Sequence, residues 1–132
     1  LRFLPELTAE RRAIAAQYLA GMQSDHITLP TLREGAEHVY HQFVVRTATR
    51  NQFKEYLSEH GIDTVIHYPI PPHLAECYAN LGYGCGSFPV AEQYADEVLS
   101  LPIFNGMRAD EIDYVIDTVN AYAGECAVHD RG

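Results

Sequence analysis

Apolar residues recur at helical spacing in several stretches of the chain. Thr8 is a candidate cap for the first stretch, and Thr49 with Gln52 forms a candidate capping box for the second. Gly61 supplies a stop for that second helix, and Pro89 suits the first turn of a later one. On these signals we expect helices at about 8–22, 50–61, 73–81, 89–97 and 109–122.

Between these helices, β-branched and aromatic residues mark strands. The stretch 39–46 (VYHQFVVR) contains no breaker and is expected to be a central strand. A second strand is expected at 62–68, a short third one at about 99–103, and a short extended piece at 27–29. Strands interleaved with helices predict an α+β fold, a small two-layer domain with helices packed on a sheet of two or three strands.

The second predicted strand leads into the segment HYPIPPH at 67–73. Because proline fixes φ and disfavours helix in the residue before it, this segment must leave the strand and run extended. His67, Tyr68 and His73 would then stand on a stiff support, which suits contact with a ligand. The alternative interpretation is a proline-rich turn whose histidines are solvated or cap a neighbouring element.

Charge and length narrow the range of functions. With 18 acidic against 9 basic residues, the chain has a net charge of -9 and no basic patch, which argues against nucleic acid binding. Its 132 residues suit one domain. No run approaches the roughly 18 apolar residues that a membrane span needs, and no signal-peptide pattern is present. We therefore expect a cytoplasmic protein.

Other candidate sites have weaker signals. His38 and His41 have no carboxylate partner at ligand spacing, so no metal site is predicted. The glycine-rich loop 82–86 could cradle phosphate, but it lacks the lysine of a P-loop. A nucleophilic cysteine beside His73 stays open, although free thiols are expected at all three cysteines, Cys77, Cys85 and Cys126.

Several features occur in a particular order along the chain: Glu10-Arg11-Arg12 in a long helix, the VYHQFVVR strand, the 50–61 helix, HYPIPPH, and Leu101-Pro102-Ile103. This order resembles the C-terminal small domain of the DegT/StrS family of sugar aminotransferases, which use pyridoxal phosphate on the aspartate aminotransferase fold. The resemblance covers about residues 1–123. HYPIPPH with Gly86-Ser87-Phe88-Pro89 is most similar to members that act on nucleotide-linked 3-keto-6-deoxyhexoses.

The resemblance implies amino transfer, usually from L-glutamate, to a nucleotide-linked keto sugar, in an intact homo-oligomeric enzyme that holds pyridoxal phosphate. In the family, a large domain provides the Schiff-base lysine and the grip on the cofactor. Lys54, the single lysine here, falls on the 50–61 helix and is not assigned that role. No catalytic or cofactor-binding residue is therefore assigned, and the chain alone is expected to be inactive. The substrate-side positions that match the family are His67, Tyr68 and, less closely, His73.

The resemblance also implies a division of the chain. Residues 1–24 would be a connector helix from a large domain before Leu1, residues 25–123 the domain body, and 124–132 a frayed tail. Two other functions stay open: a module that binds a sugar nucleotide without catalysis, and an interaction domain that uses an exposed apolar face of helix 8–22. Such a face predicts that the isolated chain self-associates.

Overall fold

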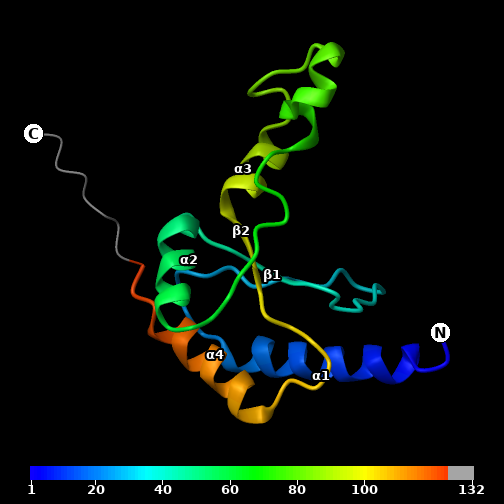
Figure 1. The fold of residues 1–132 in the computed structure, drawn as a ribbon, viewed down its shortest axis with the longest axis vertical. Helices are drawn as coiled ribbons and strands as arrows, with labels where there is room; N and C mark the ends of the chain where they lie inside the picture. Colours follow the sequence, from blue (N-terminus) through cyan, green and yellow to red (C-terminus); the bar gives the residue numbers. More distant parts are fainter. Residues whose placement is uncertain (125–132) are drawn as a thin grey trace, which may run out of the picture.

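The computed structural model describes residues 1–124, which form a body and a projecting arm (Figure 1). The body contains the helices α1 (Leu4–Gly21), α2 (Arg50–Glu59) and α4 (Ala109–Ala121). It also contains the strands β1 (Phe43–Arg46) and β2 (Val98–Leu101), which pair antiparallel with Arg46 opposite Val98. The arm consists of two short 3-10 helices and one α-helix: η1 (Pro72–Leu74), η2 (Glu76–Leu81) and α3 (Pro89–Glu97). The α+β prediction is confirmed.

The strand predicted at 39–46 is central but shorter than expected. Tyr40 has a φ of 47°, which is incompatible with a strand, and its N–H donates to His38 Nδ1 at 2.8 Å. Strand β1 therefore begins only at Phe43, and His38 lies in the preceding loop. On the side away from β2, Arg46 pairs with Thr28, which confirms the extended piece at 27–29.

Two of the sequence expectations on either side of the proline segment are wrong. The strand predicted at 62–68 is reduced to one bridge, in which Val65 and Ser100 exchange backbone hydrogen bonds of 2.8 and 3.2 Å. Only one residue pairs because the proline-rich segment leads the chain away from β2 soon afterwards. The helix predicted at 73–81 is split into η1 and η2, because Ala75 between them is extended, with ψ at 137°.

The other helices agree with the predicted positions, although two predicted caps are wrong. Helix α1 starts at Leu4 with Pro5 in its first turn, so Thr8 lies inside it. The Thr49 side chain does not cap α2, because its hydroxyl lies 2.8 Å from the Tyr122 hydroxyl instead. Gly61, at a φ of 72°, ends α2 as predicted. Cys126 and the predicted tail from residue 125 onward lie outside the described residues.

The core of the body joins all three of its helices to the sheet. The Tyr18 ring of α1 meets Phe43 of β1 edge-on at 5.0 Å, and Phe53 of α2 lies 4.8 Å from the ring of Tyr122. The apolar stripe of α1 is buried in this core, so the exposed face predicted on helix 8–22 is absent: Ile14, Ala15, Tyr18 and Met22 are all buried. No helix of the described part is long and apolar enough to cross a membrane.

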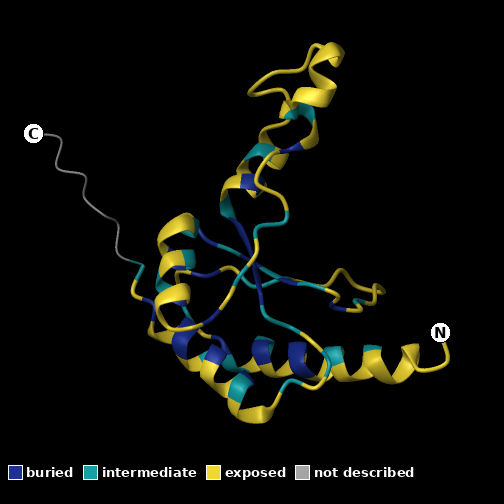
Figure 2. Cartoon of the chain, in the orientation of Figure 1, coloured by how far each residue is buried: buried dark blue, intermediate teal, exposed yellow. Residues whose placement is uncertain are grey.

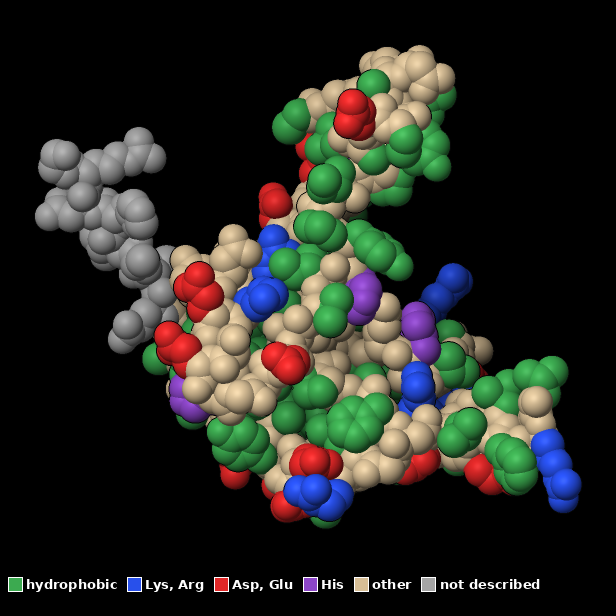
Figure 3. Space-filling view, viewed as in Figure 1, with side chains coloured by type: hydrophobic (Ala, Val, Ile, Leu, Met, Phe, Trp, Pro, Cys, Tyr) green, Lys and Arg blue, Asp and Glu red, His purple; other side chains and the backbone are tan. Residues whose placement is uncertain are grey.

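The arm, by contrast, lies largely outside this core. No residue from 72 to 94 is buried, and most of the arm is coloured as exposed in Figure 2. Figure 3 shows apolar side chains exposed along the arm, and these include Leu81, Tyr83 and Phe88. Burial of apolar surface therefore contributes little to the stability of the arm, and its conformation depends more on specific polar contacts.

Polar contacts anchor the base of the arm to the body. Arg46 of β1 forms an ion pair of 2.6 Å with Glu97 at the end of α3. Arg50 of α2 donates to the carbonyl oxygens of Ala95 and Val98 at 3.2 and 3.4 Å, which satisfies acceptors at the C-terminus of α3. These contacts set the direction in which the arm leaves the body.

Candidate functional site

His67 and Tyr68 lie where the chain passes from the body into the arm. His67 Nδ1 lies 2.8 Å from the hydroxyl of Ser100, a buried residue of β2, so the sheet orients the imidazole. The Tyr68 ring meets the His67 ring edge-on at 5.6 Å, and Tyr68 is 73% exposed. The sheet thus fixes the His67 side chain, and the Tyr68 side chain is open to solvent.

Both residues border a hollow of about 310 Å³ at the base of the arm, which we call the base hollow. Its lining is mostly apolar: His67, Tyr68, Ile70, Pro71, Pro72, Ala91, Tyr94, Ala95 and Val98. The guanidinium of Arg46 stacks over the Tyr94 ring at 4.0 Å while it pairs with Glu97. The Glu97 hydrogen bond raises the pKa of Arg46, and Gln93 and Arg46 lower the pKa of Glu97. An imidazole and a phenol beside an apolar wall are suited to binding an uncharged polar ligand.

His73 lies in a different place, on η1. Its side chain is 7% exposed, and Nε2 lies 2.8 Å from the Glu92 carboxylate of α3. Its ring meets Phe88 edge-on at 4.8 Å. It borders a second hollow of about 360 Å³, the arm hollow, lined by Pro72, His73, Tyr78, Leu81, Tyr83 and Phe88. The structure therefore brings His67 and Tyr68 together and places His73 in a neighbouring hollow.

The sequence analysis missed Ser100 and Glu92. Ser100 orients His67 across 33 residues of chain, and no local pattern could have indicated that contact. Glu92 carried a signal, because an acidic residue in the first turn of a helix directly after a glycine-rich loop faces free N–H groups. Gly86 in that loop donates its N–H to Glu92, so this donor is directed inward and not at a phosphate.

Bound pyridoxal phosphate needs a lysine with which to form its Schiff base. Lys54 lies on α2 and lines neither hollow, so neither hollow offers a lysine for a Schiff base. Within residues 1–124, no three His, Cys, Asp or Glu side chains come together to hold a metal ion. The described residues do not form a pyridoxal phosphate site by themselves.

Comparison with curated proteins relates the chain to sugar transaminases. It is 43% identical over 92% of its length to a dTDP-3-amino-3,6-dideoxy-alpha-D-galactopyranose transaminase of Aneurinibacillus thermoaerophilus, of which it covers 33%. It is 40% identical over 93% of its length to a dTDP-3-amino-3,4,6-trideoxy-alpha-D-glucose transaminase of Streptomyces venezuelae, and it covers 33% of that protein. The chain thus spans about a third of these relatives.

About a third of each of two solved aminotransferase structures has the same fold as this chain. Streptomyces venezuelae DesV in complex with a ketimine intermediate matches 96% of this chain with a TM-score of 0.90 and 38% identity, and the match covers 34% of DesV. The PLP-form of the putative sugar aminotransferase Spr1654 of Streptococcus pneumoniae matches 88% of this chain with a TM-score of 0.76 and 27% identity, over 31% of its own length. The family profile matches residues 1–120, and the chain belongs to the DegT/DnrJ/EryC1/StrS aminotransferase family.

Proposed function

We propose that the protein containing this chain is a pyridoxal phosphate-dependent aminotransferase that moves an amino group from L-glutamate to a nucleotide-linked keto sugar. The observation that carries the proposal is the 43% identity to a transaminase named for a dTDP-linked amino sugar. The chain's part is that of a small domain beside the substrate. Pyridoxal phosphate, when bound, supplies the electron sink for amino transfer.

In this proposal, the base hollow receives part of the sugar. His67, held through Nδ1 by Ser100, offers its Nε2, and the exposed Tyr68 offers its hydroxyl to hydroxyl groups of the sugar. Such hydrogen bonds would orient the keto carbon and exclude wrong poses, a positioning role. His73 contributes the wall of the arm hollow, because Glu92 already occupies its Nε2.

The test is an assay on the product of the full reading frame that encodes this chain. With added pyridoxal phosphate, a dTDP-linked 3-keto-6-deoxyhexose and L-glutamate, we expect formation of 2-oxoglutarate and the amino sugar. The matched control is the 132-residue chain alone, which should be inactive because Lys54 is its only lysine and lies away from both hollows. A full-length product that neither binds the cofactor nor turns over would favour a non-catalytic module that binds a sugar nucleotide.

The amino donor is tested separately in the same assay. Replacing L-glutamate by L-glutamine, L-aspartate or L-alanine at equal concentration should lower kcat/KM. A donor that gives a higher kcat/KM than L-glutamate would contradict the donor assignment and leave the transaminase assignment intact.

A further inference from the structure

Residues 72–94, which we call the outer arm, are held in place without a buried core. Between residues 72 and 94 no residue is buried as a whole, and the helical segments before α3 are two short 3-10 helices. Gly82 and Gly86, both at positive φ, add backbone freedom to the loop between η2 and α3. A segment of this kind has no apolar core, so its conformation depends on individual polar contacts.

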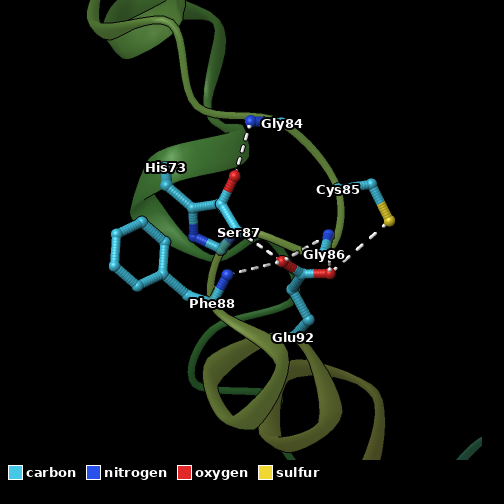
Figure 4. Close-up of polar contacts among 7 residues, drawn as sticks. All are labelled: His73, Gly84, Cys85, Gly86, Ser87, Phe88 and Glu92. Atoms are coloured by element: carbon cyan, nitrogen blue, oxygen red, sulfur yellow. Dashed lines mark hydrogen bonds and ion pairs between the residues drawn. The ribbon is translucent and has the colours of Figure 1, made fainter.

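The Glu92 carboxylate makes most of the side-chain hydrogen bonds in this segment. Glu92 accepts the Gly86 N–H at 2.8 and 2.9 Å through its two oxygens, and the Phe88 N–H at 3.1 Å (Figure 4). The same carboxylate contacts His73 Nε2 at 2.8 Å and accepts the Cys85 thiol at 3.5 Å. Glu92 therefore ties together η1, the 84–88 loop and the first turn of α3.

Because backbone N–H groups donate to both oxygens of Glu92, these contacts favour an ionised carboxylate at position 92. An ionised carboxylate is acceptor-only, whereas the amide of glutamine would turn an NH₂ group toward some of these donors. The Gly86 N–H, then His73, then the Phe88 N–H lower the pKa of Glu92 to about 2. The carboxylate is therefore charged at every pH near neutrality.

The same contacts place the walls of the arm hollow. His73 is held between Glu92 and the Phe88 ring, and both His73 and Phe88 line the hollow with Tyr78 and Tyr83. The Tyr83 ring in turn meets Phe88 edge-on at 5.0 Å. If the carboxylate releases its donors, His73 and Phe88 lose their fixed positions together.

We propose that Glu92 is a positioning residue: its carboxylate fixes His73 and the 84–88 loop, and so shapes the arm hollow for the substrate. This inference rests on the proposed function where it concerns the substrate. Its structural part, the fixing of the loop, stands on the contacts alone.

The experiment compares Glu92→Gln with wild type in the full-length protein. The matched control is Glu76→Gln, a substitution of an exposed acidic residue on the same arm. We expect Glu92→Gln to speed amide hydrogen exchange in peptides covering 84–88 about tenfold, with exchange in the β1 peptides unchanged. Alkylation of Cys85, resolved from that of Cys77 by mass spectrometry, should also accelerate, because loss of the charge lowers the raised pKa of the Cys85 thiol.

The kinetic readout separates positioning from loss of fold. Glu92→Gln should raise KM for the keto sugar several-fold with a smaller change in kcat, and Glu92→Asp, which keeps the charge, should partly restore KM. Unchanged exchange at 84–88 and unchanged Cys85 alkylation would overturn the proposal whatever the activity. Faster exchange with wild-type KM would overturn the substrate part. An inactive wild-type protein would remove the proposed function, while exchange and alkylation would still decide whether Glu92 fixes the loop.

Discussion

At the scale of single residues, His67 and Tyr68 differ in how the fold holds them. Ser100 fixes the His67 ring from β2, so little conformational freedom is left to lose when a ligand binds. Tyr68 is 73% exposed, and its ring meets the His67 ring edge-on. The pair thus combines one preorganised group and one adaptable group at the edge of the base hollow.

His67→Asn and Tyr68→Phe should each lower kcat/KM for the keto sugar by about 2- to 10-fold, the value of one neutral hydrogen bond. Steady-state kinetics of the full-length protein measures the change. The controls are His41→Asn, an exposed histidine of the loop before β1, and Tyr114→Phe on α4, which should both keep wild-type kinetics. Equal losses in the controls would contradict a specific role for the base hollow.

Glu92 gives the outer arm a defined response to acid. Its folded pKa of about 2 lies below its ordinary value of 4.5, so its stabilising contribution is fully present above 4.5. That contribution is lost as the pH falls from 4.5 through 2. In the 132-residue chain, the NMR shifts of the Gly86 and Phe88 amides should therefore titrate with a midpoint near 2. A midpoint at the ordinary glutamate value would contradict the contacts that hold the carboxylate.

At the scale of elements, α3 of the arm continues into β2 of the sheet with no loop between them. Val98 both caps α3 and begins β2, so the direction of the arm depends on the junction between them. Arg46 and Arg50, from two elements of the body, hold this junction through Glu97 and two backbone carbonyls. Charged side chains of the body thus hold the arm at the C-terminal end of α3.

Arg50→Ala should loosen this junction without unfolding the body. Loss of its hydrogen bonds to Ala95 and Val98 should cost about 1 kcal/mol, which is about fivefold faster amide exchange in α3. Hydrogen exchange with mass spectrometry measures the change. Arg33→Ala, at an exposed loop position, is the control and should leave the exchange of α3 unchanged. An unaltered α3 in Arg50→Ala would show that the ion pair of Arg46 suffices.

At the scale of the whole molecule, the buried core lies in the body, and the outer part of the arm has no buried residue. Large apolar side chains are exposed on the arm and at the start of α1: Leu4, Leu7, Tyr78, Leu81, Tyr83, Phe88 and Val90. Exposed apolar surface of this kind favours association. We therefore expect the arm to drive self-association. The apolar stripe of α1 cannot do so, because it is buried.

The 132-residue chain should self-associate at high concentration, as measured by multi-angle light scattering. Leu81→Gln combined with Val90→Gln should reduce the apparent mass, because both side chains are more than half exposed, at 57% and 66%. The control Leu32→Gln changes an apolar residue that is 52% exposed on a loop of the body. A monodisperse monomer in the wild-type chain would show that the exposed arm does not drive association.

By itself, the sequence determined the features that depend on near neighbours. Helices α2, α3 and α4 and the end of β2 before Pro102 follow from apolar spacing, from Gly61 and from Pro89, all of which act within a few residues. The combined order of motifs also identified the family, which the match over residues 1–120 confirms. The HYPIPPH segment leads the chain out of the sheet as predicted, since proline acts on its own backbone and on the residue before it.

Only the tertiary structure decided what depends on distant partners. The stretch 62–68 looked like a strand, but β2 offers it a partner at Val65 alone. The sequence places His67 and His73 on one proline-rich segment and does not show whether their rings converge. In the structure, Ser100 holds the first and Glu92 the second, so they border different hollows. The physical reason is the same in each case: hydrogen bonds across 19 to 35 residues are set by packing, and local sequence patterns do not record them.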